Sequence, residues 1–129
     1  MEKSNIHVIL SAAISIDGKI STRINDSKLS SKQDSIRLHK LRSKVDAILI
    51  GKNTLLQDNP LLTVRYTKGK NPIRIILDST VSIPTNSRII KTSNDVQTII
   101  AVSKKINNDY LNCLQNKSFK SFAPKFFAN

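Results

Sequence analysis

Three polar side chains near the middle of the chain, Thr54, Asp58 and Arg65, have the types and the spacing to contact one small molecule. They follow an apolar run from Val45 to Ile50 that is broken by a single aspartate, and such a run is typical of a strand covered on both faces. In open α/β sheets, ligands bind beyond the carboxyl ends of parallel strands. We therefore expect Gly51 to Leu62 to form a polar loop at a ligand cleft, followed by a second strand that Arg65 closes.

The elements around this region alternate between strand and helix patterns, which predicts an α/β sheet. Asp17-Gly18 marks a two-residue hairpin turn, and Ser30 with Gln33 fits a capping box at a helix start. The predicted strands are Ile6 to Ile16, Ile73 to Leu77 and Thr98 to Val102, and the predicted helices are Ser31 to Lys44 and Asn107 to Asn116.

Arg42 lies on the border of an apolar helix stripe rather than opposite it. At about 100° per residue, Leu38, Leu41 and Val45 form the stripe. The Arg42 side chain is therefore expected to reach toward a cleft.

Length and composition limit the possible classes of protein. With 129 residues and 39% hydrophobic content, the chain is expected to form a single domain, 1–129. One cysteine excludes an intramolecular disulfide, and two distant histidines offer no metal-ligand cluster. No run is long enough to span a membrane, so a cytoplasmic protein is expected.

The formal net charge of +12 calls for an anionic partner or a solvated basic surface. The basic residues are spread along the chain, and the four Phe residues lie close to the C-terminus, where they cannot interleave with those basic residues as stacking platforms. This distribution makes nucleic acid an unlikely partner and favours a basic surface that attracts small anions.

Two common nucleotide-binding motifs are absent from the sequence. Gly51-Lys52 lacks both the earlier glycine and the following Ser or Thr of a phosphate loop, and the remaining glycines, Gly18 and Gly69, are too far away for a Rossmann turn. Any dinucleotide would require a different architecture.

Three motifs resemble the reductase family of riboflavin biosynthesis: ISIDGKIS at 14–21, LHKLRSKVDAILIGKNTLLQDNPLLTVR at 38–65 and PIRIILDS at 72–79. The family comprises the C-terminal reductase domain of bacterial bifunctional deaminase-reductases and the stand-alone archaeal and fungal reductases. The resemblance implies a dihydrofolate-reductase-like fold, with a mixed, mostly parallel sheet flanked by helices. It also implies NADPH as cofactor and a phosphorylated pyrimidine as substrate, whose ribosyl group is reduced to a ribityl chain.

The resemblance also assigns roles to individual positions. The expected cofactor contacts are Ile14, Thr54, Asp58 and Ser79, with Asp58 also a catalytic candidate. The expected substrate contacts are Lys19, Ser27, Arg42, Leu62 and Arg65, of which the two arginines suit a phosphate ester. No metal ligand is expected.

Several of these positions also fit a simpler interpretation. Asp58 is equally suited to accept backbone hydrogen bonds within its own loop. Arg42 alone would be assigned to a solvated helix surface, and Ser79 to turn chemistry. His39 is expected to be an exposed or interfacial helix residue.

The chain also departs from the family pattern. Relatives continue into a glycine-rich segment that holds cofactor phosphates, whereas no glycine follows Val102 here. We therefore expect the C-terminal part of the domain to be incomplete. The resemblance also implies a homodimer, which is common among relatives. The alternatives are a truncated, non-catalytic domain that binds anions or, less favoured, a basic nucleic-acid-binding module.

Overall fold

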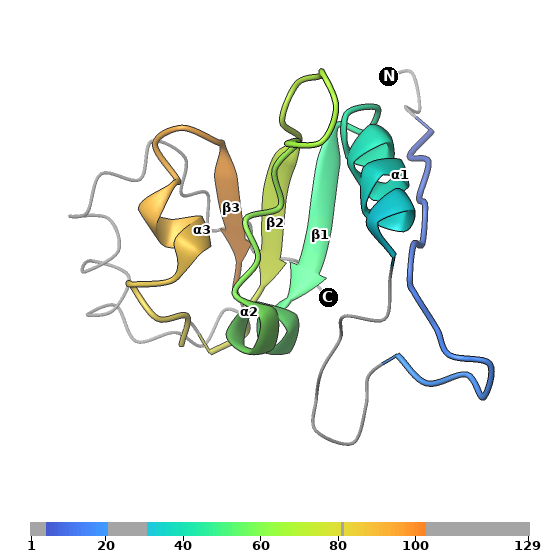
Figure 1. The fold of residues 1–129 in the computed structure, drawn as a ribbon. Helices are drawn as coiled ribbons and strands as arrows, with labels where there is room; N and C mark the ends of the chain where they lie inside the picture. The colour runs from blue at the N-terminus through green and yellow to red at the C-terminus, as the bar shows by residue number, and fades with distance from the viewer. Residues whose placement is uncertain (1–4, 21–30, 81, 103–129) are drawn as a thin grey trace. The chain divides into compact units, whose positions relative to one another are not determined.

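Figure 1 shows a computed structural model of the chain, which describes residues 5–20, 31–80 and 82–102. The chain divides into two compact units, Met1–Ser31 and Lys32–Asn129. The predicted helix from Asn107 to Asn116 and the Ser30 capping position lie outside the described residues.

The first unit contains a tight turn around Gly18. The Gly18 N–H donates to the Ser15 carbonyl at 2.9 Å, and the Ser15 N–H donates to the Lys19 carbonyl at 2.8 Å. Gly18 has a φ of 77°, which favours glycine, and this pattern is typical of a hairpin with a three-residue loop and a bulge. The turn is as predicted, but the predicted two-residue loop is wrong.

Residues 5–15 form no strand in the structure, so the predicted first strand from Ile6 to Ile16 is wrong. A strand requires a hydrogen-bonded neighbour, and the strand pairs of the described residues all lie within the second unit. The apolar residues of this segment, among them Ile6, Val8 and Leu10, are exposed. An apolar sequence favours a strand but cannot supply its partner.

The second unit is built on a parallel sheet of three strands in the order β1-β2-β3. The strands are β1 (Ala47–Gly51), β2 (Ile73–Leu77) and β3 (Thr98–Ala101). These are the three apolar runs predicted from the sequence, with ends that agree to within two residues. Parallel strands and intervening helices confirm the predicted α/β class.

The described residues of this unit form three helices: α1 (Lys32–Arg42), α2 (Lys52–Asp58) and α3 (Arg88–Lys91). Figure 1 shows α2 just beyond the arrowhead of β1. α1 confirms the predicted helix, although it ends two residues earlier. α2 corrects the predicted polar loop, because Lys52–Asp58 is helical and Asn59 ends the helix in the left-handed conformation, its N–H bonded to the Leu55 carbonyl.

One face of the sheet packs against α2 and α3. Ile76 of β2 and Ile100 of β3 are fully buried there, and Ile48 and Ile50 of β1 pack at the margin. The other members of this core are Leu55, Leu62, Ile83, Ile89, Ile90 and Val102. Burial of this apolar surface is the main stabilising contribution to the unit.

The opposite face of the sheet is only partly covered. Leu49 of β1 and Leu77 of β2 point to this side and are 59% and 42% exposed. The prediction that the β1 run is covered on both faces is therefore wrong for this structure. An unbroken apolar run shows that both faces tolerate burial, but it does not show what covers them.

The segment that connects α2 to β2 is irregular, so the predicted second strand ending at Arg65 is also wrong. Leu62 has a φ of 52°, a left-handed value that is incompatible with strand geometry. Its side chain is nevertheless buried in the core. The segment is therefore held in position by the packing of Leu62 against the core and not by pairing with a strand.

Arg74 of β2 is fully buried and ties the segment to the sheet. Its guanidinium donates to the Leu61 carbonyl at 3.1 Å, to the Ile89 carbonyl at 3.1 Å and to the Thr98 hydroxyl at 2.7 Å. Further bonds reach Thr92 and Val96. Burial lowers the pKa of Arg74 to about 10, which still leaves it charged at neutral pH.

Candidate functional site

Polar side chains gather at both ends of the parallel strands in the second unit. Lys52 directly follows β1, and Asp78 directly follows β2, so these two residues stand at the carboxyl edge of the sheet. Arg42 precedes β1 and Arg65 precedes β2, at the amino edge. The two edges offer different chemistry.

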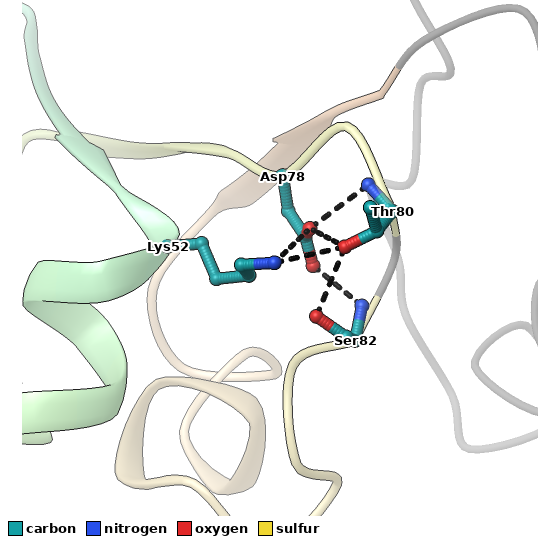
Figure 2. Close-up of polar contacts among 4 residues, drawn as sticks. All are labelled: Lys52, Asp78, Thr80 and Ser82. Atoms are coloured by element: carbon teal, nitrogen blue, oxygen red, sulfur yellow. Dashed lines mark hydrogen bonds and ion pairs between the residues drawn. The ribbon is translucent and has the colours of Figure 1, made fainter.

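At the carboxyl edge, the Asp78 carboxylate organises the loop after β2, as Figure 2 shows. Its Oδ1 accepts the Thr80 N–H at 3.1 Å and the Thr80 hydroxyl at 3.0 Å, and its Oδ2 accepts the Ser82 N–H at 2.6 Å. These bonds cap the end of the strand and order the loop. Asp78 is buried, so a buried charge is satisfied rather than left free.

Lys52 links this loop to the end of β1. Its ammonium donates to the Thr80 hydroxyl at 2.9 Å and lies 3.8 Å from Asp78 Oδ1 (Figure 2). The ion pair is a side-chain contact between the residues that directly follow β1 and β2. It connects the start of α2 to the loop after β2.

At the amino edge, Arg42 and Arg65 surround His39 of α1. The Arg65 N–H donates to His39 Nδ1 at 2.9 Å, and Arg42 Nη1 lies 3.5 Å from His39 Nε2 and 3.4 Å from the Thr63 carbonyl oxygen. We name His39, Arg42 and Arg65 the basic cluster. No ion pair joins either arginine to a carboxylate in the described part of the chain.

Tyr66 extends the basic cluster with an aromatic surface. Its ring centroid lies 4.5 Å from that of His39, and the Arg65 guanidinium lies 5.8 Å from the Tyr66 ring centroid. A hollow of about 460 Å³ beside it is lined by Lys32, Ser35, Ile36 and Tyr66. An arginine over an aromatic ring is a favourable cation–π geometry.

Gly69 allows the loop that carries Arg65 to approach α1. A Cβ atom at Gly69 would overlap the Cβ atom of Ser43, the residue that follows α1. Only glycine fits at this distance. The close approach brings Arg65 and Tyr66 against the same helix as His39 and Arg42.

The charges within the basic cluster repel one another. Burial lowers the pKa of Arg42, and the nearby Arg65 lowers it further. Burial also lowers the pKa of His39, followed by the positive charges of Arg42 and Arg65. A bound anion would relieve this repulsion.

The structure does not bring the predicted site residues into one pocket. Arg42 and Arg65 lie together at the amino edge, whereas Thr54 and Asp58 lie on α2 and Ser79 follows β2, at the carboxyl edge. Arg65 was expected to close a second strand, but it belongs to an irregular segment that has already returned to the amino edge.

The remaining predicted positions have other surroundings. The Leu62 side chain is buried, so only its backbone is available to a substrate. In the first unit, Ile14 is exposed, and Lys19 pairs with Asp17 at 2.6 Å. Ser27 lies outside the described residues.

Sequence reasoning missed His39 and Lys52 as members of these clusters. His39 is 3% exposed, which corrects the expectation of an exposed or interfacial residue. Its position one turn before Arg42 was the available signal, because residues three apart share a helix face. For Lys52, the sequence contains no sufficient signal. Its position opposite Asp78 follows from the parallel register of β1 and β2, which is known only from the structure.

The described residues also bear on metals and membranes. Within them, no group of three or more His, Cys, Asp or Glu side chains is placed to hold a metal ion. None of their helices is long and apolar enough to cross a membrane.

A parallel sheet with intervening helices defines the class of α/β domains. Within this class, the chain belongs to the RibD C-terminal domain family, whose model matches residues 6–124. The match spans both units of the structure.

Curated relatives support this assignment. Over 101 residues the chain is 41% identical to the 2,5-diamino-6-ribosylamino-4(3H)-pyrimidinone 5′-phosphate reductase of Methanothermobacter thermautotrophicus, covering 76% of this chain and 46% of that protein. It is 39% identical over 110 residues to the Aquifex aeolicus protein of the same name, covering 81% of this chain and 49% of that protein. The chain thus spans about half the length of these curated relatives.

A solved structure agrees with the sequence comparison. The Thermotoga maritima diaminohydroxyphosphoribosylaminopyrimidine deaminase/5-amino-6-(5-phosphoribosylamino)uracil reductase superposes with a TM-score of 0.62 at 32% identity. The match covers 70% of this chain and 26% of that one. Its reductase domain confirms the predicted dihydrofolate-reductase-like fold.

Proposed function

We propose that this chain acts within an NADPH-dependent reductase that converts the ribosyl group of a pyrimidine ribosylamino 5′-phosphate into a ribityl chain. The two units would belong to one reductase domain, since a single family model spans both. The curated relatives named as reductases of such a phosphate ester support this proposal. The overall reaction consumes one NADPH and one proton, and the hydride reduces the C1 carbon of the sugar.

The basic cluster is the observation that supports phosphate binding most directly. The Arg42 guanidinium lies beside His39, the positive charge of Arg65 is close enough to lower the pKa of Arg42, and no carboxylate ion pair with either arginine is found among the described residues. Arginine binds phosphate through paired N–H donors. Arg42 and Arg65 would therefore hold the 5′-phosphate, with Lys19, Ser27 and the Leu62 backbone as further substrate contacts.

The carboxyl edge fits part of the cofactor. Hydroxyl groups of Thr54 and Ser79 and the carboxylate of Asp58 follow β1 and β2, and such groups suit hydrogen bonds to ribose hydroxyls and a carboxamide. Ile14 would provide a backbone contact from the first unit. NADPH, when bound, supplies the hydride, while these residues bind and orient it.

NADPH fluorescence titration of the full chain tests the cofactor half of the proposal. Saturable binding is expected, and Asp58→Asn should weaken binding or lower turnover. Lys91→Gln, an exposed change on α3, is the matched control and should leave the titration curve unchanged.

Ribose 5-phosphate titration tests the other half. Binding of the phosphate ester without any binding of NADPH would favour the alternative, a non-catalytic chain that binds anions. Binding of neither ligand would contradict the proposal. Retained NADPH binding with no affinity for the ester would instead remove the phosphate role of Arg42 and Arg65.

A further inference from the structure

The hydrogen-bond pattern of His39 defines its protonation. Nδ1 accepts the backbone N–H of Arg65 at 2.9 Å, so Nδ1 has no hydrogen of its own. The neutral ring then carries its hydrogen on Nε2. This assignment follows from the donor and acceptor roles of the two groups.

The Nε2–H group has no acceptor within the described residues. Its neighbour at 3.5 Å is Arg42 Nη1, and a guanidinium can only donate hydrogen bonds. The two nitrogen atoms therefore form a contact between donors rather than a hydrogen bond. The Nε2–H group is therefore free to donate to an acceptor on a bound ligand.

We propose that His39 is a third ligand of the anion site at Arg42 and Arg65, with Nδ1 holding the Arg65 backbone and Nε2–H donating to an oxygen of a phosphate monoester. One phosphate oxygen beside Arg42 Nη1 and His39 Nε2 would accept from both donors. This inference rests on the proposed function, because it assumes that the basic cluster binds phosphate.

Proton binding by His39 is coupled to this role. A second proton on the ring would displace the Arg65 N–H from Nδ1 and place a third positive charge between Arg42 of α1 and Arg65 of the adjoining segment. Tyr66 is the other titratable group that packs on the ring. A bound phosphate dianion would stabilise the imidazolium, so phosphate binding and proton uptake should be linked.

Proton NMR titration of the full chain with inorganic phosphate tests this linkage. The chain has two histidines, so His7, which is exposed, provides the reference signal. Saturating phosphate should raise the pKa of His39 and leave the His7 titration unchanged. An equal shift at both residues, or none at His39 when phosphate is bound, would overturn the proposal.

Two substitutions separate the roles of the ring nitrogens. His39→Gln keeps an amide donor near the Nε2 position, whereas His39→Asn keeps an acceptor near the Nδ1 position and loses the distal donor. Ribose 5-phosphate should bind about tenfold more weakly to the Asn variant and within about threefold of normal to the Gln variant, because a hydrogen bond to a charged group is lost in the first only. Lys40→Gln, an exposed change on α1, controls for loss of a positive charge.

The outcomes also distinguish this inference from the proposed function. If the unmodified chain binds the ester and the Asn variant binds it equally well, the His39 role is excluded and the arginine site remains. If the unmodified chain binds neither inorganic phosphate nor the ester, the proposed phosphate site itself is contradicted. If the Asn variant fails to fold, an unchanged pKa of His39 in the unmodified chain at saturating phosphate still excludes the role of His39.

Discussion

At the scale of single residues, the backbone and the side chain of Arg65 have different partners. The backbone N–H bonds to His39, while the guanidinium lies near Tyr66 and close enough to Arg42 to lower the pKa of that group. A truncation of the side chain can therefore leave the backbone contact in place. This separation makes Arg65 the cleaner of the two arginines to test.

Arg65→Ala should weaken binding of ribose 5-phosphate by tenfold or more, since charge-assisted hydrogen bonds contribute about 1.5–3 kcal/mol. Arg65→Lys should give an intermediate affinity, because it keeps the charge but loses the two-pronged geometry. Isothermal titration calorimetry measures both. Arg37→Ala on α1, where Arg37 pairs with Asp34, is the control, and equal losses in all three variants would refute a specific role for Arg65.

His39 predicts how the stability of the chain depends on pH. Its pKa lies below the ordinary value of 6.5 in the folded chain, because burial and then Arg42 and Arg65 disfavour the imidazolium. As the pH falls through 6.5, the unfolded chain gains a proton that the folded chain does not. The free energy of unfolding should therefore decrease with acidification and level off below the folded pKa.

Urea unfolding at about pH 7.5 and about pH 5.5 measures this dependence, in the range where histidine titrates. His39→Asn removes the titrating group, so the variant should lose less stability than the unmodified chain over the same interval. An identical pH dependence in both proteins would show that other groups are responsible.

At the scale of elements, Arg74 connects several parts of the second unit through hydrogen bonds. Its bonds join β2 to β3, to α3 and to the segment after α2. Removing the guanidinium would take a hydrogen-bond donor from the carbonyl groups of Leu61, Ile89, Thr92 and Val96. Such a buried network is costly to break once it has formed.

Arg74→Met should therefore destabilise the fold by about 2–3 kcal/mol, because the hydrogen bonds of a buried charged group to carbonyl and hydroxyl groups are lost. Arg74→Lys should recover only part of this stability, because lysine offers fewer donors in a different geometry. Urea denaturation followed by circular dichroism measures the loss. Arg88→Lys at an exposed position is the control, and a loss below about 1 kcal/mol for Arg74→Met would contradict the structural role.

The sequence predicted the elements better than it predicted their connections. The runs at Ile73–Leu77 and Thr98–Ala101 are short, β-branched and bounded by polar residues, so periodicity was sufficient to find both strands. The segment at Lys52–Asp58 was misread as a loop, since a helix of only seven residues is too short to show a clear period. Leu62 fits a strand by composition, and only its φ of 52° excludes one.

The candidate site shows a similar division. Residue type and the family resemblance identified Arg42 and Arg65, but the edge of the sheet at which they lie depends on the path of the irregular segment, and that path depends on Arg74 and Gly69. Sequence patterns describe local periodicity. They do not encode a contact between residues 26 positions apart, such as the Arg65–His39 hydrogen bond.

At the scale of the whole molecule, the chain presents apolar surface that its described residues do not cover. Leu49 and Leu77 on the open face of the sheet are the clearest examples, and Ile6, Val8 and Leu10 in the first unit are also exposed. Exposed apolar surface of this kind marks a site of further packing. Since the chain spans about half the length of its curated relatives, those relatives contain additional sequence that this chain does not match.

Because the net charge is +12, the chain attracts anions of any size. The salt dependence of binding distinguishes a small phosphate ester from nucleic acid as its partner. A phosphate monoester held by the basic cluster involves one anionic group, so its affinity should fall only a few-fold between about 50 mM and about 200 mM salt. Nucleic acid contacting many basic residues would lose about a thousandfold or more over the same range. Fluorescence titration with labelled DNA and calorimetry with ribose 5-phosphate at both salt concentrations compare the two. Tight, steeply salt-dependent binding to DNA of arbitrary sequence, together with no affinity for the ester, would replace the reductase interpretation with a nucleic-acid-binding one.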